Sequence, residues 1–384
     1  MVNSLLAPLV VASISGALAY PSVARSRNGT CEGYTIAVSP SSTGLHYSYP
    51  PFKDNFDVVE FVTRLSSRDS ASFYPFSGPL SLSGNYTIAA EICSPAVKTG
   101  KEKTLLLTSH GLGYHGDYWN PPVEPPIEQQ YNFVGYALGQ GYSVFNYDRL
   151  GTGRSSRVDG YNEGQTSQQI AILTELAQLL RNGQYTGSIG APSKLVLVGH
   201  SFGSFISNGV VAGSTANNSL IDGLLLTGFS YNLTSPDYEA FALKIASTER
   251  REWADLDNGY ITWNDVYSNV AVFFRAPAYS HAVANWTECQ KQAIALSEFL
   301  TFPMLDLYSP GFTGPVQILN GELDFGICDG NCTDWVEPYA AKMFPNAKVV
   351  EVLEHPSVGH AINFQYNSTG AYSAMMRFVD KHLA

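Results

Sequence analysis

Ser201 lies between two glycines, in the pattern Gly199-His200-Ser201-Phe202-Gly203, directly after an apolar run. The run Leu195–Val198 predicts a strand buried on both faces, and the small and apolar residues 202–212 predict a helix. The chain must reverse between them within very few residues, and flanking glycines permit the dihedral angles and close packing of such a turn. The serine hydroxyl then lies at a helix N-terminus, where free N–H groups favour negative charge. The pattern predicts a nucleophile; a glycine turn with an ordinary serine is the alternative.

A serine hydroxyl becomes a nucleophile when an imidazole accepts its proton and a carboxylate orients that imidazole. After a turn of this type the acid comes first along the chain and the histidine second. Beyond the strand predicted at 315–320 the histidines are His355, His360 and His382. His360 follows Gly359 in a loop and is our candidate base, and His355, nearer the strand end, is its rival. His382 ends the last predicted helix, where a positive charge suits the helix dipole.

Asp324 is the candidate acid. It lies four residues beyond the strand predicted at 315–320, where the turn can direct its carboxylate toward the histidine loop. Glu322, Asp329 and Asp334 are the rivals, interpreted as solvated loop charges.

An oxyanion hole needs two N–H donors directed at the tetrahedral oxygen. One comes from Phe202, the residue after the nucleophile, and the other from the loop after the strand predicted at 104–109. That loop reads His110-Gly111, with Leu112 as the expected second donor and Gly113 as the alternative.

Other polar residues near these motifs are interpreted as structural. The side chains of His110 and His200 are expected to brace their loops rather than to titrate in catalysis. The segment 148–155 has two glycines, but its spacing is not that of a phosphate-binding loop and no Lys-Ser/Thr pair follows. We expect a structural turn there.

Strands alternate with helices through most of the chain after residue 103. Strands are predicted at 104–109, 142–147, 195–198, 223–229, 315–320 and 348–353, with helices at 133–139, 168–181 and 202–212. The helix at 168–181 has apolar residues at helical spacing: Ile170, Leu173, Leu176 and Leu180. This order predicts an α/β fold, with a mainly parallel sheet flanked by helices.

The segments around this core have different patterns. Residues 1–19 resemble a signal peptide, and residues 20–100 are expected to pack on the sheet edge, with antiparallel strands at 34–38 and 86–92 and a helix at 56–65. Residues 230–314 interrupt the core formed by 101–229 and 315–384. They predict a helical cap over the ligand crevice. Its aromatic side chains either line that crevice or fill the core of the cap. We expect most of them to fill the core of the cap.

Composition excludes some functions. The net charge is −11 and no Lys/Arg-rich run occurs, which argues against nucleic acid or an anionic membrane as a partner. No segment after the signal peptide is apolar over the length of a bilayer, so a secreted protein is expected. No Cys/His spacing suggests a metal site, and no cofactor is implied.

Cysteines and glycosylation sequons agree with export. Of five cysteines, Cys31 with Cys93 and Cys328 with Cys332 are plausible pairs, which leaves Cys289, although sequence does not determine the connectivity. Asn-x-Ser/Thr sequons occur at seven positions: Asn28, Asn85, Asn217, Asn232, Asn285, Asn331 and Asn367.

Together the motifs resemble the α/β-hydrolase superfamily over about residues 103–384, apart from the cap. They are 110–113, Asp148-x-x-Gly-x-Gly-x-Ser155, 199–203, Gly321-x-x-Asp324 and Gly359-His360. Further details are similar to secreted α/β hydrolases of filamentous fungi: Tyr118-Trp119, Gly141-Tyr142 and Thr227-Gly228-Phe229. The resemblance implies a cofactor-independent Ser-His-Asp hydrolase. The turn at residues 199–203 lacks the Trp-rich sequence of proline iminopeptidases and the Asp nucleophile of epoxide hydrolases.

The expected function is hydrolysis of carboxylic esters with a hydrophobic acyl or alcohol group. Two other classes stay open. The same triad supports a lyase or acyl-transfer reaction, and a hydrolase fold can also serve as a non-catalytic binding protein.

Overall fold

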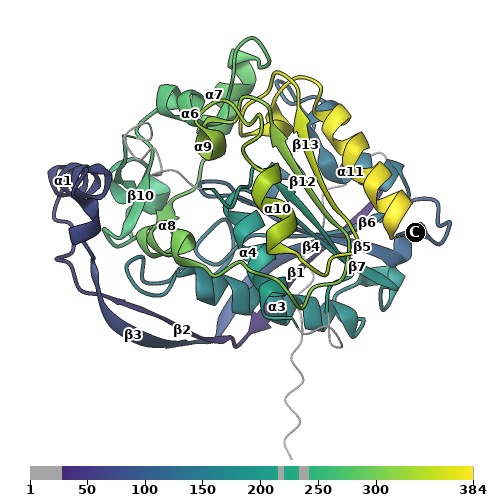
Figure 1. Cartoon of the computed structure of the whole chain (residues 1–384), viewed down its shortest axis with the longest axis horizontal. Helices are drawn as coiled ribbons and strands as arrows, with labels where there is room; N and C mark the ends of the chain where they lie inside the picture. Colours follow the sequence, from purple (N-terminus) through teal and green to yellow (C-terminus); the bar gives the residue numbers. More distant parts are fainter. Residues whose placement is uncertain (1–27, 215–219, 233–241, 384) are drawn as a thin grey trace, which may run out of the picture.

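A computed structural model describes residues 28–214, 220–232 and 242–383 (Figure 1). The predicted signal peptide at 1–19 and the sequon at Asn217 lie outside these ranges. Among the helices in the described part of the chain, none has the length and hydropathy that crossing a bilayer requires.

A sheet of eight strands forms the centre of the described structure, in the order β1-β4-β6-β5-β7-β8-β12-β13. From β6 to β13 the neighbouring strands are parallel, and β4 and β1 continue the sheet antiparallel at one edge. The strands are β1 (Gly29–Val38), β4 (Tyr86–Pro95), β5 (Thr104–Ser109), β6 (Ser143–Tyr147), β7 (Lys194–His200), β8 (Gly223–Thr227), β12 (Val316–Gly321) and β13 (Val350–His355). Every residue of β5, β6 and β8 is buried, as expected for apolar strands covered on both faces. The mainly parallel sheet is confirmed.

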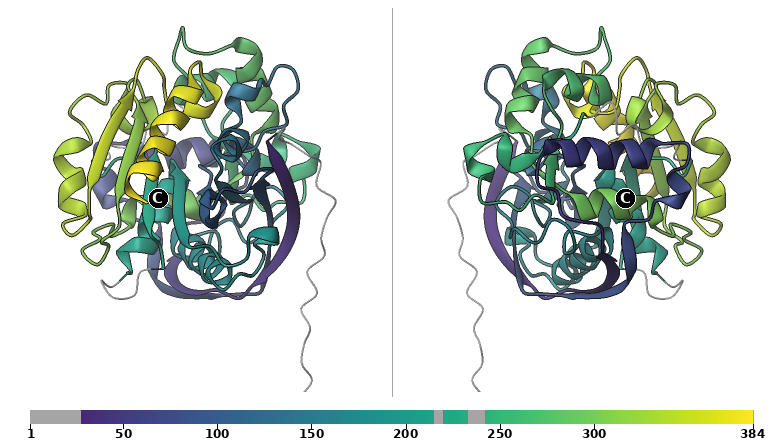
Figure 2. Two further views of the ribbon diagram at one scale, coloured as in Figure 1. Left: turned by 90° about the vertical axis from the view of Figure 1, so that its right-hand side faces the viewer. Right: turned by 90° about the vertical axis from the view of Figure 1, so that its left-hand side faces the viewer.

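Helices cover the sheet in two packed pairs, α2 with α11 and α3 with α4 (Figures 1 and 2). The helices of this part are α2 (Phe133–Gly139), α3 (Thr166–Arg181), α4 (Phe202–Ala212), α9 (Phe325–Cys328), α10 (Glu337–Met343) and α11 (Ser368–His382). Three of the apolar residues predicted to face the core from α3 are buried: Leu173, Leu176 and Leu180. The fourth, Ile170, is half-buried and packs beside Gly209 of α4.

The segment before β5 supplies the antiparallel edge of the sheet and two further elements. The strands and helix expected here are present, the helix as α1 (Asn55–Ser66), where the Asp54 side chain caps the first turn. A separate hairpin, β2 (Ser41–Tyr47) with β3 (Phe76–Ser83), was not predicted, because β2 has little apolar character. Asn55 accepts a hydrogen bond from the Ile245 N–H, which connects this segment to the insertion after β8.

The insertion between β8 and β12 contains the expected helices and also three short strands. In its described residues the helices are α6 (Val266–Phe273), α7 (His281–Gln290) and α8 (Leu296–Thr301), and the sheet comprises β9 (Lys244–Ile245), β10 (Tyr260–Thr262) and β11 (Ile294–Ala295). Strands of two or three residues are too short to produce a sequence pattern. Most of its aromatic rings are buried, including Trp253, Trp263 and Phe274, whereas Tyr267 is 79% exposed.

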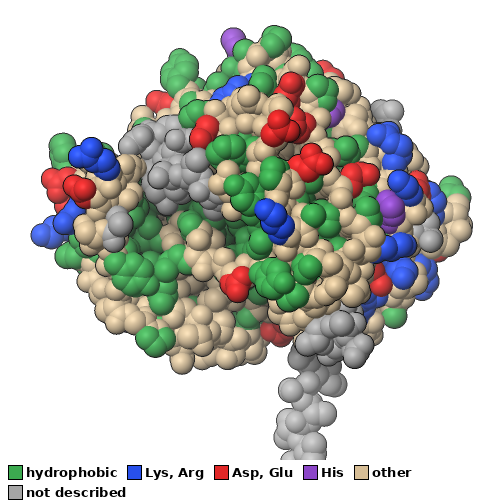
Figure 3. Space-filling view, viewed as in Figure 1, with side chains coloured by type: hydrophobic (Ala, Val, Ile, Leu, Met, Phe, Trp, Pro, Cys, Tyr) green, Lys and Arg blue, Asp and Glu red, His purple; other side chains and the backbone are tan. Residues whose placement is uncertain are grey.

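Surface charges are dispersed on the face shown in Figure 3. Lys and Arg side chains form small groups near α11 and α1, with acidic, polar and hydrophobic side chains between them.

Two disulfides are present among the described residues, Cys31–Cys93 between β1 and β4 and Cys328–Cys332 between the last residue of α9 and the segment that follows it. Cys289 is free and exposed. Both pairs are those that the sequence analysis considered.

The Cys31–Cys93 bond should contribute strongly to stability, because it joins residues 62 positions apart. Replacing both cysteines by alanine is expected to lower the free energy of unfolding by about 4 kcal/mol, through the larger entropy of the unfolded chain. Urea denaturation measures this loss. The control variant Cys289→Ala should unfold like the parent protein, and a loss of less than about 1 kcal/mol in the double variant would contradict the prediction.

Candidate active site

Ser201 occupies the sharp turn between β7 and α4. Its backbone has φ 52° and ψ −124°, a conformation that costs about 1–3 kcal/mol for a residue with a side chain. The turn is held because the Ser201 N–H donates to the Thr227 carbonyl (2.8 Å) and the Ser201 carbonyl accepts from the Ser204 N–H (2.7 Å). Ser201 stays partly exposed, whereas the neighbouring residues His200 and Phe202 are buried. The structure therefore has the predicted strand, turn and helix.

The two flanking glycines allow α4 to approach the sheet closely. A Cβ on Gly199 would lie 2.5 Å from the Ser204 Cα, and a Cβ on Gly203 would lie 2.1 Å from the Ser109 carbonyl oxygen. Neither position tolerates a side chain, since both neighbours are backbone atoms. This close packing is what the glycine spacing predicted.

Gly203→Ala should therefore destabilise the protein, because the new methyl group pushes α4 away from the end of β5. We expect a loss of about 2–3 kcal/mol in the free energy of unfolding, as for other overpacked core positions. Gly213→Ala at the end of the same helix is the matched control. Its Cβ would be 3.9 Å from the nearest atom at φ −78°, so stability should be unchanged or slightly higher. Equal stabilities in denaturant titrations of the two variants would contradict this account.

Asp324 and His360 form a buried pair. The His360 Nδ1 lies 2.7 Å from the Asp324 Oδ2, and the two residues are 3% and 0% exposed. Asp324 is also the N-cap of α9, where its Oδ1 accepts from the Ile327 N–H (3.1 Å). A carboxylate partner places the ring proton on Nδ1 and leaves Nε2 as the hydrogen-bond acceptor. Asp324 and His360, the candidate acid and the candidate base, therefore lie within hydrogen-bonding distance of each other.

The His360 loop is held from both sides. The Ala361 N–H donates to the Phe273 carbonyl of α6 (2.8 Å), and the Gly359 N–H donates to the buried Gln365 side chain (2.9 Å). The Phe273 ring packs 5.6 Å from the imidazole, centroid to centroid. The insertion therefore helps to fix the position of His360.

Ser201 and His360 each contact the turn after β8. Thr227 accepts the Ser201 N–H, and a Cβ on the next residue, Gly228, would lie 2.8 Å from the His360 Cε1. Gly228 has φ 57°, so both its backbone conformation and its neighbour favour glycine. Ser201, Asp324 and His360 thus follow the carboxyl ends of the parallel strands β7, β12 and β13. Sheets of this kind bind ligands at the carboxyl ends of their strands.

The residues considered as alternatives to His360 and Asp324 make different contacts or are exposed. His355 ends β13, with its Nε2 2.9 Å from the Asn367 carbonyl oxygen. Glu322 accepts from the Ser357 N–H (2.7 Å), and Asp329 and Asp334 are exposed.

The loop after β5 lies against Ser201. A Cβ on Gly111 would be 3.0 Å from the Ser201 Cβ, and Leu112 beside it is buried. The His110 Nε2 accepts from the Arg149 N–H (3.0 Å), so the ring proton is on Nδ1, which donates to the Gly111 carbonyl (3.0 Å). Burial, and then the Arg149 charge, lower the His110 pKa well below its ordinary value. A neutral, bracing His110 matches the expectation.

His200 packs next to His360, a contact for which the sequence had no signal. Its ring stacks on Tyr118 with centroids 4.2 Å apart, and its centroid is 4.8 Å from that of His360. The Nδ1 lies 3.2 Å from the Thr227 Oγ1. Burial, and then the nearby His360, lower the pKa of His200 well below its ordinary value. His200 is a neutral packing residue beneath the histidine loop.

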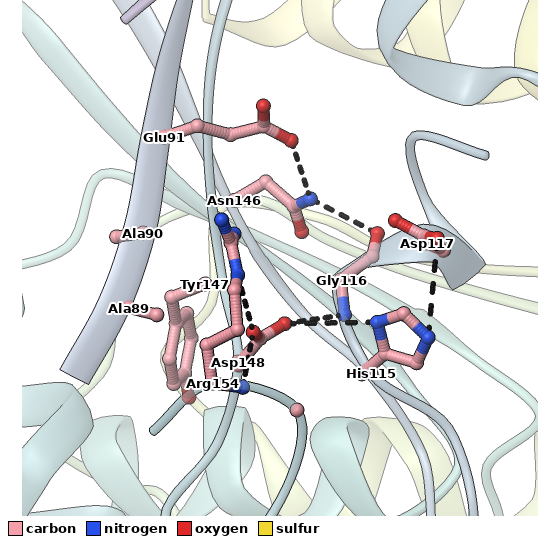
Figure 4. A pocket seen from close by; sticks show the side chains of 11 residues that line it. Ala89, Ala90, Glu91, His115, Gly116, Asp117, Asn146, Tyr147, Asp148 and Arg154 are labelled. Carbon is pink, nitrogen blue, oxygen red and sulfur yellow. Dashed lines mark hydrogen bonds and ion pairs between the residues drawn. The ribbon is translucent and has the colours of Figure 1, made fainter. Parts of the chain in front are cut away.

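The segment 148–155 is a braced turn beside a small polar pocket (Figure 4). The Asp148 carboxylate accepts from the Gly116 N–H (2.9 Å) and the Arg154 N–H (3.0 Å). His115 lies 3.9 Å from both Asp148 and Asp117. These bonds make the turn structural, as expected.

Among the described residues, one group has the spacing of metal ligands: Cys31, Glu91 and Cys93. Its two cysteines are joined in a disulfide, so they supply no thiolate ligands.

Comparisons with known proteins agree with this architecture. Solved structures with a similar fold include an esterase from Thermogutta terrifontis (17% identity, 78% of this chain and 94% of that chain, TM-score 0.53). A second is an esterase from Exiguobacterium antarcticum (17% identity, 77% of this chain and 96% of that chain, TM-score 0.53). A third is a putative aryl esterase from Burkholderia cenocepacia (15% identity, 77% of this chain and 95% of that chain, TM-score 0.50). A search of curated proteins found no match. Residues 105–369 match the Alpha/beta hydrolase family, a span that includes the turn at Ser201, Asp324 and His360, and the chain therefore belongs to that family.

Proposed function

We propose that this protein is a serine hydrolase that cleaves carboxylic esters. The observation that carries the proposal is the buried Asp324–His360 pair, 2.7 Å apart, beside the strained turn that presents Ser201. Such a pair leaves the imidazole Nε2 available as a base, and a serine at this kind of turn is the group from which it takes a proton.

In the proposed mechanism the Ser201 Oγ attacks the acyl carbon while the His360 Nε2 accepts its proton. The oxyanion is held by the N–H groups of Phe202 and Leu112. Collapse of the tetrahedral intermediate expels the alcohol, which receives the proton from His360, and leaves an acyl-enzyme. Water then attacks with His360 again acting as the base, and the acid is released. Asp324 stabilises the imidazolium in both steps.

A hydrophobic substrate is supported by the aromatic side chains around the histidine loop. Tyr114 contacts Tyr118, Trp263, Phe273 and Phe364 through ring packing, and Phe273 contacts His360. Solved structures with a similar fold also include esterases. We propose that the insertion acts as a cap over the acyl or alcohol group.

Hydrolysis of p-nitrophenyl esters of graded chain length tests the proposal, with amide and lactone analogues beside them. We expect release of p-nitrophenolate and covalent labelling of Ser201 by a fluorophosphonate. Failure of both would favour a binding protein. Formation of new esters when several alcohols are present would favour acyl transfer.

We also propose that the protein is exported. Disulfides persist mainly in oxidising compartments, and the sequon residues Asn85, Asn285 and Asn331 are exposed. Removal of N-linked glycans from the secreted protein should lower its mass; an unchanged mass would contradict glycosylation.

A further inference from the structure

Arg149 lies fully buried behind the loop that follows β5. Its guanidinium group donates from Nη1 to the Glu298 Oε2 (2.6 Å), from Nε to the His110 carbonyl (3.0 Å) and from Nη2 to the Gly111 carbonyl (3.2 Å). The side chains of Arg149 and Glu298 are 0% and 1% exposed. One cation thus holds two consecutive carbonyl groups of the loop.

These bonds determine the orientation of the next peptide group. In a planar trans peptide, the carbonyl and the following N–H point in opposite directions. The Gly111 carbonyl accepts from both Arg149 and the His110 Nδ1, so the Leu112 N–H is directed away from Arg149. Leu112 is the residue for which we propose the second oxyanion contact.

The same guanidinium group also contacts the other proposed donor residue. Its central carbon lies 4.6 Å from the centroid of the Phe202 ring, within the range of a cation–π interaction. Arg149 therefore touches the loop on one side and the first residue of α4 on the other. Its counter-ion Glu298 belongs to α8 of the insertion, which compensates a charge that would otherwise be buried without a partner.

We propose that Arg149 is a positioning residue that aligns the two oxyanion donors, with Glu298 as its counter-ion. This inference rests on the proposed esterase function. Arg149 does not touch the substrate; it acts by fixing the Gly111–Leu112 peptide against Ser201 and by packing on Phe202. A misaligned donor weakens binding of the tetrahedral intermediate more than binding of the ester, so the loss should appear in kcat.

The test is Arg149→Met, which keeps the length of the side chain and removes its five donors. We expect kcat for a p-nitrophenyl ester to fall roughly 30- to 100-fold, somewhat less than for complete loss of one donor, with KM changed by less than about threefold. A trifluoromethyl ketone forms a tetrahedral oxyanion on the serine, and its inhibition constant should rise by the factor by which kcat/KM falls. A merely structural defect would not produce this parallel change.

Arg154→Met is the matched control, because Arg154 is on the same turn but its side chain is 67% exposed and contacts Asp148. Its kcat and ketone affinity should equal those of the parent. Arg149→Lys keeps a charge opposite Glu298 but replaces the planar fork with a single ammonium group, so we expect roughly a tenfold loss in kcat.

The kinetics of the Arg149 variants either support or overturn the proposed positioning role of Arg149. A folded Arg149→Met variant with kcat within threefold of the parent would overturn the proposal, as would a fall in kcat with unchanged ketone affinity. If Arg149→Met does not fold, Arg149→Lys takes its place, and parental kcat in that variant would overturn the proposal. A parent protein without ester turnover would instead remove the proposed function, before any variant is made.

Discussion

Ser201→Ala is expected to reduce kcat for a p-nitrophenyl ester by about 10⁴- to 10⁶-fold. The proposed mechanism passes through a covalent bond to the Ser201 Oγ, and alanine has no atom that can form it. The fold should be unaffected, because the turn is held by the backbone bonds of residue 201 to Thr227 and Ser204, which alanine retains. Thermal denaturation and circular dichroism check the fold, and steady-state kinetics measure the loss.

Ser207→Ala is the matched control for that experiment. Ser207 is on the same helix, and its hydroxyl bonds to the Gly203 carbonyl (2.7 Å) within that helix. Its kcat should stay within about threefold of the parent, since such bonds add little to a helix. If Ser201→Ala kept a tenth or more of the parental kcat, Ser201 would not be the nucleophile.

Asp324→Asn should have the second-largest effect, a fall in kcat of about 10⁴-fold. The Asn oxygen can still accept the Ile327 N–H, so the cap of α9 is retained. Its amide nitrogen then faces the His360 Nδ1, where Asp324 now accepts a hydrogen bond. An NH₂ group there donates to Nδ1 and drives the ring proton to Nε2, so the base has no free lone pair for the serine proton.

Glu322→Gln separates the two acids considered in the sequence. Glu322 accepts from the Ser357 N–H at 2.7 Å, a bond that glutamine retains, so kcat should stay within about threefold of the parent. Loss of activity in Glu322→Gln but not in Asp324→Asn would transfer the acid role to Glu322. Both variants should be compared at equal folded fraction, measured by denaturant titration.

Local patterns were sufficient to predict much of the core and one part of the site. The apolar run of β7, the small residues of α4 and the glycines at 199 and 203 are adjacent in sequence, and each constrains the next through burial or close packing. The strand ends preceding Asp324 and His360 were visible for the same reason. By contrast, β2 and the strands β9 to β11 are short or weakly apolar, so their pairing depends on contacts with distant segments.

The class of fold, the candidate nucleophile and the small set of possible partners could be predicted from the sequence, because hydrophobic periodicity, glycine spacing and chain order can be read along the chain. Which of these partners lie together depends on how distant segments pack. His355 and His360 are five residues apart, and both follow the last predicted strand closely. The path of the loop places His360 beside Asp324, whereas His355 contacts the Asn367 carbonyl. Arg149 and Glu298 are 149 residues apart, and a buried ion pair between them follows from the packing of the insertion on the core, which no local pattern encodes.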